Sequence, residues 1–159
     1  MTKSLVIVYS CHHRNTERIA QVIGHVLDAP VKRPDEVTPE EISGYELIGV
    51  GSGIYHGRHH ESLLSLADRL PGGTSGTAFL FSTAGITGGA KTARDHSLLR
   101  EELQAKGYVI AGEFSCKGFN TNSFLKYFGG MNKGRPNAED IQRAEKCARG
   151  LVKDYLTEQ

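Results

Sequence analysis

The 159-residue chain contains no tryptophan, only three cysteines and little net charge. Cys11, Cys116 and Cys147 lie far apart and form no CxxC pair, which argues against a disulfide framework and against a thiolate zinc site. A membrane-spanning helix needs about 20 consecutive apolar residues, and the apolar run near the start, residues 5–8, is far shorter. These absences predict a cytoplasmic protein that does not associate with membranes.

The charged residues are nearly balanced, with 19 Lys and Arg against 18 Asp and Glu and a formal net charge of +1. Nucleic-acid-binding domains usually carry a marked excess of basic residues, so we expect no nucleic-acid partner. Apolar and charged fractions of 38% and 23% are those of a folded globular protein. The sequence shows no repeat or linker, and we expect a single domain over residues 1–159.

Short apolar runs alternate along the chain with stretches whose apolar residues recur at helical spacing. This alternation predicts an α/β fold, a doubly wound parallel sheet of five strands. The expected strands are residues 4–9, 31–33, 47–51, 77–82 and 108–115; the expected helices include 61–70, 91–106 with Leu98, Leu99 and Leu103 on its apolar face, and a last helix from about 137. Ligands of such sheets bind beyond the carboxyl ends of the strands, where the strand order reverses.

The loop after the first strand joins a buried strand to an amphipathic helix. Unpaired N–H groups and the positive end of the helix dipole therefore face this loop. Its candidate ligand-binding residues are neutral donors and basic groups: Ser10, His12, His13, Arg14, Asn15 and Thr16. Helix capping alone would explain the serine, asparagine and threonine. It does not explain the basic residues, because their positive charges are repelled by the positive end of the helix dipole unless an anion lies between them. The residues of the loop therefore favour a phosphate-binding site.

The segment from Val8 to Ala20 resembles the strand–loop–helix signature of the flavodoxin family, in which a Ser/Thr-rich loop ending in Asn-Thr surrounds the phosphate of FMN. The resemblance implies a flavodoxin-like sheet with strand order 2-1-3-4-5 and FMN as the cofactor. Two departures stand out: Arg14 occupies the position where the family usually has glycine, and the loop is one residue longer between serine and asparagine.

Two further loops resemble the flavin-binding segments of the family. In the loop after the third strand, which would lie along the isoalloxazine ring, a peptide at Gly53 or Gly57 would turn over on reduction, because glycine permits that change. The loop after the fourth strand would offer backbone donors to the pyrimidine edge. The cofactor-binding residues expected in the two loops are Ser52, Gly53, Ile54, Tyr55, Ser82, Thr83, Ala84, Gly85 and Gly88. Ordinary tight turns explain the same residues without a ligand.

Three functions remain open. The first, which we expect, is an FMN-binding carrier, a monomer or homodimer, that passes electrons between redox protein partners. The second is an FMN-dependent oxidoreductase that uses NAD(P)H to reduce a quinone or another small electron acceptor at a basic rim formed by His56, Arg58, His59 and His60. The third is a protein that keeps only the fold and binds a partner. Positive charge on the rim predicts a final reduction potential less negative than that of an acidic flavodoxin.

Other chemistries are disfavoured. The first strand is not followed by glycine, so the GxGxxG fingerprint of NAD-binding sheets is absent where it would have to occur. The clustered histidines have no carboxylate or thiolate fixed beside them, which disfavours a metal site. No side chain is expected to act as a catalyst, and Cys116 is expected to be a buried structural thiol.

Overall fold

The computed structural model describes residues 3–11, 14–118 and 134–157, and their central feature is a parallel sheet. Its five parallel strands are β1 (Ser4–Tyr9), β2 (Val31–Lys32), β3 (Leu47–Tyr55), β5 (Thr77–Ala84) and β6 (Val109–Lys117). They lie in the order β2-β1-β3-β5-β6, which confirms the predicted order 2-1-3-4-5 of the parallel strands. A short strand, β4 (Arg58–His59), was not predicted and pairs antiparallel with β3.

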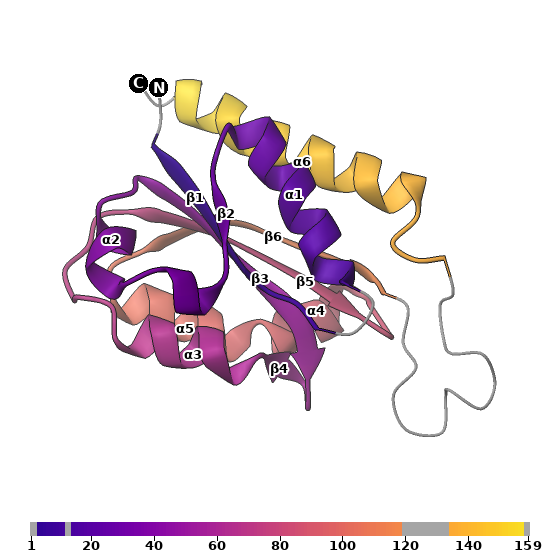
Figure 1. Ribbon diagram of the computed structural model, residues 1–159, viewed down its shortest axis with the longest axis horizontal. Coiled ribbons are helices and arrows are strands. Elements are labelled where there is room, and N and C mark those ends of the chain that lie inside the picture. The colour runs from indigo at the N-terminus through magenta and orange to yellow at the C-terminus, as the bar shows by residue number, and fades with distance from the viewer. Residues whose placement is uncertain (1–2, 12–13, 119–133, 158–159) are drawn as a thin grey trace.

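Helices cover both faces of the sheet (Figure 1). Helices α1 (Asn15–Leu27) and α6 (Ala138–Thr157) lie on one face, while α3 (Glu61–Asp68) and α5 (Ser97–Ala105) lie on the other. The short helices are α2 (Pro39–Ser43), α4 (Gly89–Asp95) and the 3-10 turn η1 (Pro34–Glu36). None of the helices in the described ranges is long and apolar enough to cross a membrane.

The sheet separates two apolar clusters. In β1, the predicted central strand, Leu5 to Val8 are at most 3% exposed because alternate side chains enter the cores on opposite faces. Leu5 and Ile7 pack with α3 and α5, whereas Val6 and Val8 pack with α1 and α6. The continuous apolar run in the sequence is therefore a strand covered on both sides.

The predicted helix 91–106 is two helices, α4 and α5, that meet at His96. His96 is fully buried, and Leu99 and Leu103 follow it at helical spacing on the buried face. Leu98, which was predicted to lie on that face, is 47% exposed. The prediction was wrong for Leu98 because the buried face of α5 is set by His96 together with Leu99 and Leu103. A search for apolar residues alone does not include a histidine.

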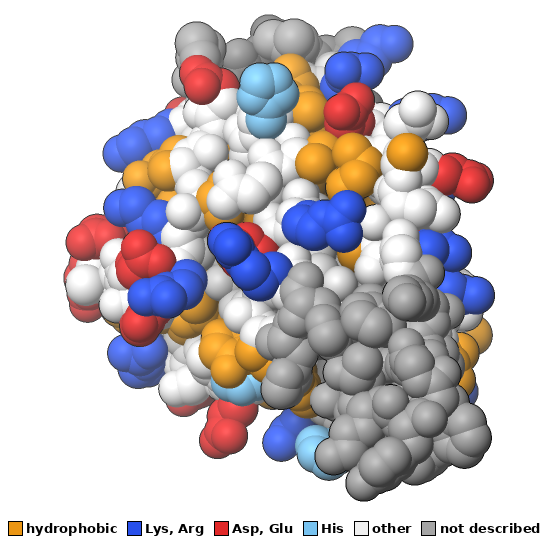
Figure 2. All heavy atoms as spheres, turned by 45° about the vertical axis from the view of Figure 1, so that its right-hand side comes forward, with side chains coloured by type: hydrophobic (Ala, Val, Ile, Leu, Met, Phe, Trp, Pro, Cys, Tyr) orange, Lys and Arg blue, Asp and Glu red, His pale blue; other side chains and the backbone are white. Residues whose placement is uncertain are grey.

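The described surface carries charges of both signs. On the face shown in Figure 2, Lys and Arg side chains lie interspersed with Asp and Glu side chains. This distribution agrees with the near-zero net charge of the sequence. The net charge of the chain therefore gives no reason to expect that it attracts a strongly charged partner over a long distance.

Candidate functional site

Three segments meet at the carboxyl edge of the sheet: the β1–α1 loop, the β3–β4 hairpin and the β5–α4 loop. Cys11 Sγ lies 2.8 Å from Tyr55 Oη, which joins the loop to the hairpin. Thr16 Oγ1 lies 2.8 Å from Thr83 Oγ1, which joins the start of α1 to the end of β5. The structure thus brings together the three segments that the sequence predicted to be neighbours.

Helix α1 starts at the loop predicted to hold a phosphate. Its N-cap residue, Arg14, has φ 53° and ψ 34°, in the left-handed region, and its side chain makes no capping hydrogen bond. The guanidinium instead pairs with Glu17, with Nε 2.6 Å and Nη2 2.5 Å from the carboxylate oxygens. The N-cap side chain therefore leaves the first N–H groups of the helix without a side-chain cap. His12 and His13, also predicted to bind the phosphate, lie outside the described residues.

Ser10 carries a buried hydroxyl beside this helix end. Its Oγ has no hydrogen-bond partner among the described residues. Ser10 and Arg14 both line a cavity of about 550 Å³. A buried hydroxyl without a partner costs about 1–3 kcal/mol, so such a group commonly has a functional explanation. A phosphate oxygen bound at the start of α1 would supply the partner.

Thr16 and Thr83 combine a structural contact with a remaining donor. Both side chains are at most 5% exposed, and their hydroxyls bond to each other across the interface between α1 and β5. Each hydroxyl has one proton, and the contact uses one of the two. The pair therefore fixes the start of α1 against β5 and keeps one O–H group for a further acceptor.

The segment after the third predicted strand is not a loop. Strand β3 continues through Ser52, Gly53 and Ile54 to Tyr55, and Tyr55 pairs with Arg58 of β4. The two residues between them, 56 and 57, both have positive φ, of 53° and 77°. This is the pattern of the two-residue turns that suit the twist of a β-hairpin. Gly57 is thus required by the turn, whereas Gly53 lies against the Tyr55 ring.

Three rings form a cluster at this edge. Tyr9 stacks on His60, with centroids 3.6 Å apart and an angle of 11° between the planes, and Tyr55 meets His60 edge-on at 5.0 Å. Burial, with the contact to Cys11, raises the pKa of Tyr55. His60 Nδ1 accepts a hydrogen bond from the Ser62 N–H, and burial lowers the pKa of His60. Both rings are consequently neutral at neutral pH.

The predicted basic rim is only partly present. His56 and Arg58 are exposed at the tip of the hairpin. His59 is 1% exposed, so its place on the rim was wrong: β4 turns its side chain under the sheet edge. Across the described ranges, no group of three or more His, Cys, Asp or Glu side chains is placed to hold a metal ion.

Two predicted site serines point to the α3–α5 face. Ser52 Oγ donates to the Gly53 carbonyl at 2.6 Å and accepts from the His60 N–H at 2.9 Å. Ser82 Oγ lies 2.7 Å from His96 Nε2 and 3.2 Å from Ser115 Oγ. Both hydroxyls are thus engaged within the chain, and both residues lie in the sheet between two paired strands.

The remaining predicted residues lie around the same edge. Ala84 ends β5, and its carbonyl accepts from the Gly118 N–H at 3.1 Å. Gly85 follows directly in the chain, and Gly88, with φ 153°, is the N-cap of α4. A Cβ on Gly118 would lie 2.7 Å from the amide of Asn15, so the end of β6 packs closely on the phosphate loop.

Comparisons with known proteins agree with this geometry. A family profile described as a flavodoxin domain matches residues 6–121. The chain belongs to the flavodoxin family. A relative, protein MJ0298 of Methanocaldococcus jannaschii, is 43% identical over 152 residues, covering 96% of this chain and 99% of the relative.

Solved flavodoxin structures share the fold at low sequence identity. Flavodoxin 2 from Bacillus cereus has a TM-score of 0.70 at 16% identity, covering 96% of this chain and 99% of its own. A flavodoxin from the domain Archaea has a TM-score of 0.62 at 17% identity, covering 95% and 97%. These likenesses concern the fold.

One departure from the flavodoxin-family signature now has a structural description. Arg14, which stands where the family usually has glycine, adopts the left-handed backbone that glycine adopts without penalty. A non-glycine residue there costs about 1–2 kcal/mol. The ion pair with Glu17 holds the Arg14 side chain along the first turn of α1.

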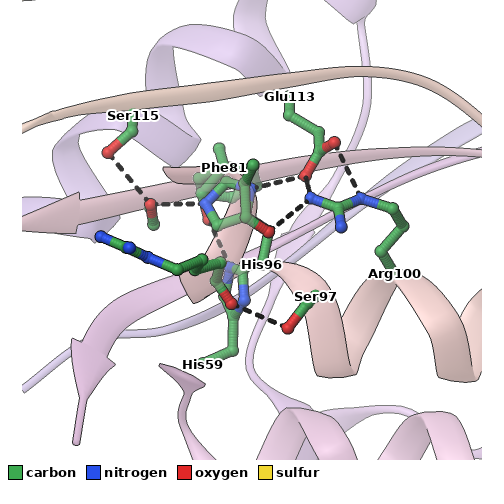
Figure 3. A network of polar contacts seen from close by, with 10 residues as sticks. His59, Phe81, His96, Ser97, Arg100, Glu113 and Ser115 are labelled. Carbon is green, nitrogen blue, oxygen red and sulfur yellow. Dashed lines mark hydrogen bonds and ion pairs between the residues drawn. The ribbon is translucent and has the colours of Figure 1, made fainter. Parts of the chain in front are cut away.

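A partly buried polar network beneath the site was missed at the level of sequence. His96, Glu113 and Arg100 come from the α4–α5 junction, β6 and α5, and they meet under the end of β5 (Figure 3). The available signal was the position of His96 on the apolar stripe of a helix. Nothing local in the sequence indicates Glu113 as its partner.

Cys116 matches the prediction of a structural thiol in this flavodoxin-family chain. It is 1% exposed, and burial, reinforced by Asp140, raises the pKa of the thiol to about 12. A thiol with such a pKa is a poor nucleophile at neutral pH. All three cysteines of the chain are free.

Proposed function

We propose that this protein binds FMN and works as an electron carrier between redox partners. The observation that carries the proposal is the buried, unpartnered Ser10 hydroxyl beside the uncapped start of α1. The start of a helix suits a phosphate dianion through its free N–H groups and its dipole. When bound, FMN supplies the redox chemistry, and the residues of the chain bind, orient and shield it.

The residues that would hold FMN have side chains suited to its phosphate and to its ring system. Ser10, Asn15 and the Thr16–Thr83 pair surround the start of α1 and would meet the phosphate. The β3–β4 hairpin, with Tyr55, and the β5–α4 loop flank the place of the ring system. Three free thiols suit a reducing compartment, so the proposal includes a cytoplasmic location. We also propose that the protein is a monomer or a homodimer.

Reconstitution tests the proposal directly. The purified protein is expected to take up FMN in a ratio near one to one, measured by absorbance after removal of free flavin. Two separate one-electron steps in an anaerobic titration are expected for a carrier. Failure to bind FMN at micromolar concentration would overturn the cofactor assignment.

The second candidate is the FMN-dependent oxidoreductase, favoured by one observation. Arg58 and His56 are exposed at the tip of the hairpin next to the proposed site, where an anionic substrate such as NAD(P)H would find a cation. Rapid two-electron reduction by NAD(P)H, with turnover in the presence of a quinone, would select this function over the carrier.

Replacing Ser10 with alanine is expected to weaken FMN binding by about tenfold to a hundredfold, the value of a hydrogen bond to a charged group. Riboflavin, which has no phosphate, should bind the variant and the wild type equally. Both dissociation constants can be measured by quenching of flavin fluorescence. Ser43→Ala on exposed α2 is the matched control and should leave both unchanged. Equal losses for FMN and riboflavin would place Ser10 away from the phosphate.

A further inference from the structure

Two histidines from distant parts of the chain are in contact beneath the proposed site. His59 lies on β4 of the hairpin, and His96 lies at the junction of α4 and α5. Their side chains are 1% and 0% exposed, and the ring centroids are 4.6 Å apart (Figure 3). Neither histidine belongs to the phosphate loop or to the residues expected to meet the flavin.

Each histidine is bonded to the end of β5. His59 Nε2 lies 3.0 Å from the Phe81 carbonyl, which can only accept, so Nε2 carries the proton. His59 Nδ1 is then a lone-pair nitrogen, buried and without a partner among the described residues. His96 Nε2 lies 2.7 Å from the hydroxyl of Ser82, the next residue along β5. The two rings therefore contact consecutive residues of this strand.

The tautomer of His96 is fixed from its other side. Nδ1 lies 2.9 Å from a Glu113 carboxylate oxygen, and Arg100 donates to the same carboxylate at 2.8 and 3.0 Å. Burial alone would raise the pKa of Glu113, but these hydrogen bonds outweigh it and leave the pKa below its usual value. An ionised Glu113 accepts the proton on Nδ1, and the Nε2 end of the ring contacts Ser82 Oγ.

We propose that His59 and His96, in their neutral forms, are positioning residues that hold the β3–β4 hairpin against the end of β5. The hairpin carries Tyr55, and the end of β5 continues into Thr83 and Ala84. The pair thereby sets the spacing of two of the three segments around the flavin. The flavin part of the inference rests on the proposed function, whereas the contact between hairpin and strand does not.

The surroundings of the pair are suited to neutral rings. The carboxylates that face it among the described residues are already paired, Glu113 with Arg100 and Asp95 with Lys91. A proton added to His59 Nδ1 would therefore have no acceptor there. Burial, together with the neighbouring His96, lowers the pKa of His59 to about 3, and burial lowers the pKa of His96 against the opposing effect of Glu113.

The sign of the pH effect follows from these directions. A histidine ring exposed to solvent has a pKa of about 6.5, which is above the pKa of the same ring when the hairpin is packed. The packed state is therefore favoured fully above about pH 6.5, and each coupled histidine weakens it by about tenfold per pH unit below that. Acidification should open the hairpin before carboxylates with ordinary pKa values begin to titrate.

Hydrogen exchange of the ligand-free protein tests the contact. The His60 amide, which bonds to Ser52 Oγ, reports the hairpin, and the amides of β1 report global unfolding. With intrinsic exchange corrected at each pH, protection of the hairpin is expected to be lower than that of β1. It should fall about fivefold through His59 alone, and further through His96, from pH about 6.5 to about 5.5. In His59→Gln the side-chain amide can still donate to the Phe81 carbonyl, and the dependence of hairpin protection on pH should be weaker than in the wild type. His25→Gln, at an exposed position of α1, should leave that dependence unchanged.

Riboflavin binding at pH about 7.5 tests positioning, because riboflavin has no phosphate that titrates nearby. His59→Leu, which leaves the Phe81 carbonyl without its donor, is expected to weaken riboflavin binding about tenfold, and His59→Gln to restore most of it. A wild-type hairpin whose protection is flat with pH would overturn the inference even in a protein that bound no flavin. Unchanged riboflavin affinity in His59→Leu would also overturn the positioning role, while leaving the cofactor assignment intact.

Discussion

Replacing Gly51 with alanine is expected to lower the free energy of unfolding by about 3 kcal/mol, the upper end of the usual cost of overfilling a core. A Cβ at this position would lie 2.3 Å from a carbon of the Phe81 ring. Phe81 is fully buried in the cluster beneath α1 and α6, so the ring has no space to move into. Gly51 is therefore needed for packing inside the sheet.

Gly49 provides the matched control because it lies two residues earlier on the same face of β3. A Cβ there would meet Val6 and Phe81 at 3.6–3.7 Å, which is ordinary contact. Gly49→Ala should change the unfolding free energy by less than about 1 kcal/mol, since no overfilling results. Urea unfolding followed by circular dichroism gives both values. A Gly51→Ala protein as stable as Gly49→Ala would contradict the description of this contact.

Global stability is expected to fall steeply between pH 6.5 and 5, because folding buries His59 and His96 as neutral rings. Their folded-state pKa values are lowered, to about 3 for His59, so the unfolded chain binds protons first. Stability is complete above about pH 6.5 and declines below it by up to about 1.4 kcal/mol per pH unit for each histidine. The loss by pH 5 is roughly 2 kcal/mol for His59, and the lowered pKa of His96 adds to it.

This range of pH separates the histidines from the carboxylates. The pKa values of Glu113 and Asp140 are lowered by their arginine partners despite burial, so their contribution is lost at still lower pH. Urea unfolding at several pH values should show the decline in the wild type and a smaller decline in His59→Gln. Stability that stays level from neutral pH to pH 5 would mean that the two rings titrate normally.

Both results bear on how the proposed flavin site is supported in this chain. Gly51 and Phe81 pack at the centre of the sheet, and the histidine pair contacts the end of β5 near the carboxyl edge. The proposed ligand contacts, Ser10 and Tyr55, lie at that edge. Changes in the support are expected to affect any flavin alike, whereas changes at Ser10 should affect only flavins that carry a phosphate.

Local patterns in the sequence predicted the parallel strands well, and the resemblance to the flavodoxin family predicted their order. β1 matches residues 4–9 because a short uninterrupted apolar run is typical of a strand covered on both faces. The third strand was predicted to end at Gly51 and instead reaches Tyr55, since pairing with β4 and β5 extends it. The turn at His56 and Gly57 had a recognisable signal, a short polar pair containing glycine, that was interpreted as part of a longer loop.

The sequence by itself determined the fold class, the strand order expected from the family resemblance, and the segments that meet at the carboxyl edge. The fold class and the segments at the edge follow from hydrophobic periodicity and chain order, which are local properties of the residues, whereas the strand order was what the family resemblance implied. Only the tertiary structure decided that Gly51 serves packing, that His59 is buried, and that Ser82, His96 and Glu113 form one network. Those contacts depend on the register of β5 with β3 and β6 and on how α5 packs beneath them. No local pattern specifies these arrangements, because each joins residues that are distant in the chain.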